Sequence, residues 1–211
     1  MSWLGEGLGG VLTGTGDPLT GAPGAVVLYA LLAVLVWPSG RVATGRGSVA
    51  TTSPLGAGAA RVAWLALWGG LAYLAVQPML RVASHPHDAI AGLAAGEPGW
   101  LSGVDNGLAG RLAGTGVAFA IVSAVVLGLI ALGVFAPARP ARAALVLAVL
   151  VAAAYWMFGE NFGGILTGQG TDPNSGPLLA LLAVAYWPAG RRPAPNALPA
   201  AEPIGVSAGQ P

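Results

Sequence analysis

Four long apolar segments constrain most strongly what this chain can fold into. They cover residues 22–37, 62–80, 117–136 and 143–158, and each approaches the roughly 17 to 25 apolar residues that a membrane-spanning helix needs. Charged residues make up only 8% of the chain, whereas a soluble domain carries about 25%. Because so little polar surface is available, the sequence predicts an integral membrane protein built from helices.

A fifth apolar segment, residues 173–187, is shorter. Its uninterrupted apolar part has roughly 11 residues, which at about 1.5 Å per residue cover only half of a hydrocarbon core near 30 Å. With Asp172 as N-cap and Pro173 as the first helical residue, this helix gains roughly one turn and still falls short of a full span. The shortfall predicts that the connection before this helix dips below the membrane surface.

The predicted fold class is all-α, a polytopic transmembrane bundle of about five spans. Residues 1–192 form a single transmembrane domain, and residues 193–211, which are rich in Pro and Ala, form a disordered cytoplasmic tail. The bundle is expected to carry re-entrant motif loops and an outer interfacial helical loop, as described below.

The arginines predict the orientation of this bundle, because cytoplasmic loops carry an excess of basic residues. With five spans, the arginines on one side are Arg41, Arg46, Arg61, Arg139, Arg142, Arg191 and Arg192. The other side holds only Arg81 and Arg111, together with seven of the eight acidic residues. We therefore expect a multi-pass protein of the plasma membrane, with the C-terminus in the cytoplasm and the N-terminus outside.

The long loop between the second and third spans, residues 82–116, is predicted to lie outside and to contain two short helices. Residues 88–95 suit a helix that stops at the following Gly and Pro residues. From Trp100 to Leu112, apolar residues recur at helical spacing opposite Asp105 and other polar residues. This pattern is typical of a helix lying on the membrane surface.

A repeated motif precedes the first and last apolar segments. Residues 5–18 read GEGLGGVLTGTGDP, and residues 159–173 read GENFGGILTGQGTDP. Each copy is followed by an apolar run that closes on Trp-Pro, a small residue, Gly and Arg, so the chain contains an internal repeat. The second copy follows a full span and the first follows only four residues, which predicts that related proteins have a further N-terminal helix.

The motif loops supply the main candidate site. Irregular backbone at membrane depth is tolerated where it lines a watery cavity, and ionisable residues there are functional candidates. The candidate residues for binding a small solute or ion in an outward-facing polar cavity are Glu6, Asp17, Glu160, Thr167, Asp172 and Asn174. The alternative interpretation is structural: Glu160 and Asp172 lie at the headgroup level, where they cap helices and accept hydrogen bonds from loop N–H groups.

A second candidate site holds both histidines of the chain, in the outer loop. Imidazole and carboxylate groups bind copper and zinc, so His85, His87 and Asp88 are candidate metal ligands. Against this, Pro86 restricts how the two rings can converge. The same stretch would serve equally as the N-terminal cap of a short helix.

Composition and motifs exclude several other functions. The absence of Cys excludes disulfides, thiolate metal sites and Fe–S clusters, and a net charge of +1 offers no footprint for nucleic acid. No nucleophile elbow or phosphate-binding Gly loop is present, so we expect no enzyme and no cofactor. The expected partners are the lipid bilayer, a small solute or ion, and a membrane protein partner or a second copy of the chain. Solute or ion handling, a structural or accessory subunit, and extracytoplasmic copper or zinc handling remain the three alternatives.

Three stretches carry a resemblance to a known family. They read GGILTGQGTDPNSGP at 163–177, AVAYWP at 183–188 and GEPGWL at 96–101. With them the chain resembles a family of multi-pass membrane proteins, without an assigned activity, from high-GC Gram-positive bacteria. The resemblance covers roughly residues 60–190 and implies a location in the plasma membrane. The first motif copy departs from the pattern, because Leu19 and Thr20 stand where the second copy has Asn174 and Ser175.

Overall fold

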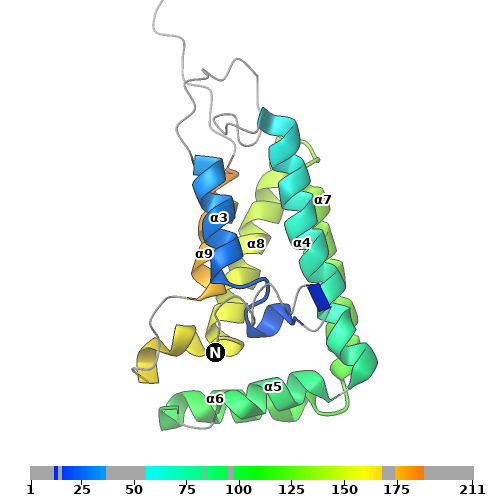
Figure 1. The fold of residues 1–211 in the computed structure, drawn as a ribbon. Coiled ribbons are helices and arrows are strands. Elements are labelled where there is room, and N and C mark those ends of the chain that lie inside the picture. The colour runs from blue at the N-terminus through cyan, green and yellow to red at the C-terminus, as the bar shows by residue number, and fades with distance from the viewer. Residues whose placement is uncertain are drawn as a thin grey trace, which may run out of the picture.

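The computed structural model describes residues 12–13, 16–36, 56–82, 84–94, 97–167 and 174–187. Over these residues the fold is all-helical, as expected, and no strand occurs among them. Figure 1 shows the longer helices running side by side along one direction, with two shorter helices lying across one end.

Three helices are long and apolar enough to cross a membrane. They are α4 (Gly56–Arg81), α7 (Gly116–Gly133) and α8 (Ala138–Phe158). They correspond to the second, third and fourth apolar segments of the sequence and pack against one another, α4 on α7 and α7 on α8. The described chain therefore has the character of an integral membrane protein with three candidate spans.

The first and last apolar segments form shorter helices. These are α3 (Ala25–Val36), with 12 residues, and α9 (Ser175–Ala185), with 11 residues. At about 1.5 Å per residue, neither helix alone covers a hydrocarbon core near 30 Å. The two helices pack against each other, and α9 also packs against α8.

Aromatic side chains join the helices in the core. The indole Nε1 of Trp64 on α4 donates a hydrogen bond of 2.9 Å to the carbonyl oxygen of Ile130 on α7. The hydroxyl of Tyr186, at the end of α9, donates one of 2.5 Å to the carbonyl oxygen of Ala60 at the start of α4. The Trp64 and Tyr186 rings also stack, with centroids 4.6 Å apart. The buried polar atoms of Trp64 and Tyr186 thus have partners, as aromatic residues usually do in an apolar core, whereas the indole N–H of Trp68 has none in the described chain.

Glycine allows α9 to approach α8 closely. A Cβ atom on Gly176 would lie 2.3 Å from the Cβ of Trp156 and 2.9 Å from the carbonyl oxygen of Ala152, so no larger residue fits without movement. Small residues at such contacts let helices pack tightly in lipid, where the hydrophobic effect does not drive association.

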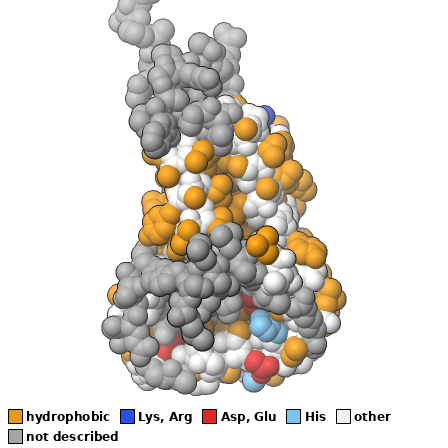
Figure 2. All heavy atoms as spheres, viewed as in Figure 1, with side chains coloured by type: hydrophobic (Ala, Val, Ile, Leu, Met, Phe, Trp, Pro, Cys, Tyr) orange, Lys and Arg blue, Asp and Glu red, His pale blue; other side chains and the backbone are white. Residues whose placement is uncertain are grey.

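The segment between α4 and α7 contains the two expected helices, α5 (His85–Leu93) and α6 (Gly99–Leu112), which pack on each other across one end of the bundle (Figure 1). Figure 2 shows acidic and His side chains gathered at this end, and hydrophobic side chains around the middle of the molecule.

The predicted faces of α6 are wrong in one respect. Asp105 was expected on the polar outer face but is 1% exposed, whereas Trp100 is 63% exposed. The reason is that α6 packs through the face holding Leu101, Asp105 and Ala109, which are all buried. Periodicity identifies the faces of a helix, but the neighbouring element decides which face is covered.

The motif copies form short 3-10 segments, η1 (Pro18–Thr20) and η2 (Asn161–Thr167). In η2 the backbone of Phe162, Gly163 and Gly164 has positive φ, so the regular helix of α8 cannot continue through it. Regular helix has already ended at Phe158, before this pair of glycines. Glycine adopts this left-handed conformation without a steric penalty.

Candidate functional site

The described parts of the two motif copies meet at the end of the bundle that α5 and α6 cover. A Cβ on Gly159 would lie 1.9 Å from the carbonyl oxygen of Leu19, so the end of α8 touches the backbone of η1. Gly21 has φ of +100°, and a Cβ there would lie 3.3 Å from Asn174 Oδ1 and 3.4 Å from Glu160 Oε1. Of the candidates proposed from the sequence, Glu6 and Asp172 lie outside the described residues, as does the side chain of Thr167.

Glu160 is buried and holds the start of α9. Its Oε2 accepts a hydrogen bond of 3.0 Å from the backbone N–H of Gly176, and its Oε1 accepts one from the hydroxyl of Ser175. Both Glu160 and Ser175 lie in the protein interior, at 6% and 0% exposure. The first N–H groups of a helix have no partner within the helix and carry partial positive charge, so a carboxylate here stabilises α9.

Asn174 is the N-cap of α9. Its side-chain Oδ1 accepts a hydrogen bond of 2.9 Å from the N–H of Ser175. The helix start predicted at Asp172 and Pro173 is therefore wrong by two residues. The side-chain amide of Asn174 accepts the first helical N–H at a positive φ of 63°, a conformation that Asn tolerates better than most residues.

Asp17 caps η1, a helix start of the kind predicted from the sequence only for the Asp-Pro pair of the second copy. Its Oδ1 accepts a hydrogen bond of 2.9 Å from the N–H of Leu19, and Pro18 occupies the first position. Its other oxygen, Oδ2, lies 2.8 Å from Nε2 of His85 on α5. The hydrogen bond with Asp17 raises the pKa of His85 above its ordinary value, although partial burial opposes this. The first motif copy is thus tied to the outer loop by a buried carboxylate.

The candidate metal ligands do not converge. His85 faces Asp17, whereas Nδ1 of His87 lies 3.0 Å from Oδ1 of the exposed Asp88. Asp88 also accepts a hydrogen bond of 2.7 Å from the hydroxyl of Ser84, and these two bonds lower its pKa. Over the described ranges, no group of three or more His, Asp and Glu side chains is placed to hold a metal ion.

A pair of acids that the sequence did not single out lies between α5 and α6. The carboxylate oxygens of Glu97 and Asp105 are buried without a hydrogen-bond donor in the described chain. The pKa of Glu97 is raised to about 7, mainly by burial and to a smaller extent by the neighbouring carboxylate of Asp105. Two carboxylates cannot donate to each other, but with a proton on Glu97 the pair can share a hydrogen bond. In the sequence, the four-residue spacing of Asp105 from Leu101 and Ala109 is the signal that it shares their buried face.

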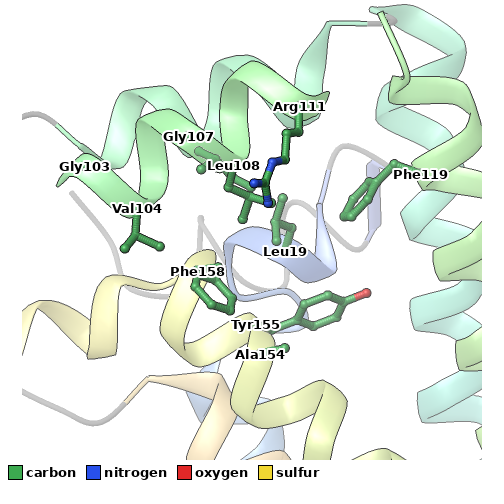
Figure 3. A pocket seen from close by; sticks show the side chains of 11 residues that line it. Leu19, Gly103, Val104, Gly107, Leu108, Arg111, Phe119, Ala154, Tyr155 and Phe158 are labelled. Atoms are coloured by element: carbon green, nitrogen blue, oxygen red, sulfur yellow. The ribbon is translucent and has the colours of Figure 1, made fainter. Parts of the chain in front are cut away.

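A cavity of about 600 Å³ lies beside the motif contact, between η1, α6 and the end of α8 (Figure 3). Its lining is mostly apolar and includes Leu19 from the first motif copy, Leu108, Phe119 and Phe158. Arg111 is the charged residue of this lining, and its side chain extends from α6 into the space (Figure 3). Of the motif candidates that the structure describes, Asp17, Glu160 and Asn174 do not line this cavity. The sequence offered no signal for it because its walls come from distant segments.

Comparison of the chain with protein families, curated proteins and solved structures finds no match. Its three candidate spans are compatible with a helical membrane protein. Its activity has to be inferred from the geometry of the cavity and of the contacts around it.

Proposed function

We propose that this protein binds a small, largely apolar solute in the cavity between η1, α6 and α8, at the extracytoplasmic face of the plasma membrane. The observation that carries the proposal is the cavity itself. Small-molecule sites are typically concave, mostly apolar and roughly 300–1,000 Å³ in volume, with a few polar groups that orient the ligand. A volume of about 600 Å³ with an apolar lining and one guanidinium meets this description.

The distribution of charge supports an extracytoplasmic position for the cavity. Arg139 and Arg142 begin α8 at the end opposite α5 and α6, and basic residues favour the cytoplasmic side. The cavity lies at the other end, among the acidic and His side chains. A solute would therefore reach it from the outside or from the outer leaflet.

The polar contacts of the motif support the proposal by holding the cavity walls. Asp17 caps η1 through the N–H of Leu19, and Leu19 lines the cavity. Asp17 also contacts His85, which places η1 against α5. We infer that Asp17 positions the wall of the cavity. From the sequence alone, it was a candidate for binding a solute or ion.

The proposal includes a five-span topology in which α3 and α9 enter the membrane as half-length helices. The connection before α9 then lies at the depth of the outer leaflet as a re-entrant loop. Such a loop is stable only if protein groups satisfy its backbone. At the start of α9, Asn174 Oδ1 accepts the backbone N–H of Ser175 and the buried Glu160 accepts that of Gly176.

Binding, and not catalysis, is the role that the cavity chemistry favours. Its described lining holds no His, Ser, Asp or Glu that could act as a nucleophile or general base. The competing proposal is that the protein is a structural or accessory subunit, in which case the cavity takes up no solute.

Radiolabelled decanol binding to protein in phosphatidylcholine nanodiscs tests the proposal. Gly107 lines the cavity and a Cβ there meets nothing within 4 Å, so Gly107→Phe should fill the space without a clash. Gly110 lies on the same helix, is equally open, and is not part of the cavity lining, so Gly110→Phe is the matched control. We expect a saturable component in the wild type and Gly110→Phe, and only linear partitioning into lipid in Gly107→Phe. Identical binding by all three proteins would favour the accessory subunit.

A further inference from the structure

We propose that the cavity selects an amphiphile with an alkyl or acyl chain and an anionic carboxylate or phosphate head, and that Arg111 binds this head. The inference rests on the proposed function and names its ligand class. It starts from Arg111, the cationic side chain of the described cavity lining, which extends into a space that is otherwise mostly apolar (Figure 3).

Arg111 has no carboxylate partner in the part of the chain that the structure describes. The two salt bridges found there both join a histidine to an aspartate, His85 to Asp17 and His87 to Asp88. An anionic ligand in the cavity would supply the opposite charge that the Arg111 guanidinium lacks among the described residues. The planar guanidinium can donate two parallel hydrogen bonds to a carboxylate or phosphate.

The apolar walls of the cavity match the alkyl or acyl chain of such an amphiphile. Arg111 is itself exposed to solvent, whereas Leu108, Phe119 and Phe158 supply apolar surface deeper between the helices. An anionic head at Arg111 would therefore remain at the water interface while its chain enters between α6 and α8. Burial of each methylene contributes about 0.8 kcal/mol in general, so the chain would supply affinity and the head would supply selectivity.

A purely structural role for Arg111 predicts a different outcome. Arg111 lies in the last turn of α6, where a positive charge stabilises the helix dipole. That role affects the stability of α6 but gives no preference between ligand heads. Comparing two ligands with the same chain and different heads therefore separates the roles.

The experiment measures the binding of decanoate and of decanol at pH 8 to protein in phosphatidylcholine nanodiscs. The binding measured with Gly107→Phe is subtracted as the background from partitioning into lipid. We expect the wild type to bind decanoate roughly tenfold more tightly than decanol, as one charge-assisted hydrogen-bonded pair would supply. Arg111→Gln should lower decanoate affinity roughly tenfold and leave decanol unchanged, and Arg111→Lys should restore part of the preference. If Arg111→Gln keeps the full decanoate preference, or if the wild type has none, the inference is overturned while decanol binding still supports the cavity. Loss of decanol binding from the wild type would instead overturn the proposed function.

The source of the amphiphile is resolved by native mass spectrometry of protein extracted from cells. A phospholipid retained by the wild type and Gly110→Phe, but lost from Arg111→Gln and Gly107→Phe, would support the inference with a bilayer lipid as ligand. Decanoate selectivity without a retained phospholipid would support it with a free anionic amphiphile. If neither retention nor selectivity depends on Arg111, the guanidinium binds no head group and the inference fails.

Discussion

The imidazole of His85 lies 2.8 Å from the carboxylate of Asp17, across 68 residues of sequence. The same carboxylate accepts the N–H of Leu19, which in turn lines the cavity. A single buried acid therefore connects the first motif copy, helix α5 and the cavity wall. The contacts of this acid lead to the first prediction.

Stability should fall as pH rises through the pKa of His85. The folded protein raises this pKa above its ordinary value of 6.5, chiefly through the bond to Asp17 and with help from the charge of Asp88. The resulting stabilisation is present below about pH 6.5 and is lost as pH rises through the folded value. Because His85 is partly exposed, we expect its contact with Asp17 to contribute at most about 1 kcal/mol to the free energy of unfolding. Between pH 5 and 8, the melting temperature should fall less steeply with rising pH in His85→Gln than in the wild type. The control is His87→Gln, which removes only the exposed contact with Asp88 and should keep the wild-type dependence of melting temperature on pH. If His85→Gln also keeps that dependence, the prediction is contradicted.

Glu97→Gln should stabilise the protein at pH 8 and have little effect at pH 5. Burial beside Asp105 raises the pKa of Glu97 to about 7 from an ordinary 4.5, so the folded state holds a proton that the unfolded state releases. Stability therefore decreases as pH rises from 4.5 to 7, and the neutral amide avoids this loss. After allowing for solvent screening, we expect Glu97→Gln to raise the free energy of unfolding at pH 8 by about 1 kcal/mol. Asp105→Asn should act in the same direction, and equal pH slopes in Glu97→Gln and the wild type would argue against a buried acid pair.

Glu160→Ala should destabilise the protein, and Glu160→Gln should do so much less. The alanine leaves the N–H of Gly176 and the hydroxyl of Ser175 without this acceptor, a loss of roughly 1–3 kcal/mol for buried groups. Glutamine keeps a carbonyl oxygen for one of them. Thermal unfolding measures the cost, and decanol binding measures function in the same samples. If Glu160→Gln is as stable as the wild type but fails to bind decanol, the side chain acts on the ligand and not as a cap.

Gly176→Ala should destabilise the contact between α8 and α9. Its Cβ would meet the Cβ of Trp156 and the carbonyl oxygen of Ala152 inside normal contact distances, so backbone must move. Overpacking of this kind costs roughly 1–3 kcal/mol. The matched control is Gly69→Ala on α4, where a Cβ meets nothing within 4 Å and the change should be neutral or slightly stabilising. Size-exclusion recovery after heating would compare them, and equal recovery would show that α9 can shift without cost.

The predicted five spans are confirmed only in part, and the re-entrant loops stay a prediction. Three of the five segments form helices of spanning length, and the other two form α3 and α9, which are shorter. Their proposed depth in the membrane depends on lipid contacts, which helix length alone does not decide. Cysteine accessibility scanning along α9 in intact cells would measure that depth directly.

Local sequence alone determined the features that depend on neighbouring residues. Apolar runs of spanning length require helices, because lipid offers no partner for backbone polar groups. Asp17 directly before Pro18 favours a cap, and Gly163 and Gly164 permit the left-handed backbone of η2, which follows the end of α8 at Phe158. Only the tertiary structure decided which polar groups meet: Glu160 with Ser175, Asp17 with His85, and Asp105 on the covered face of α6. The cavity belongs to the same category, since Leu19, Arg111 and Phe158 line it from three separate elements. Helical periodicity describes one element at a time, whereas burial and hydrogen bonding depend on what packs against it.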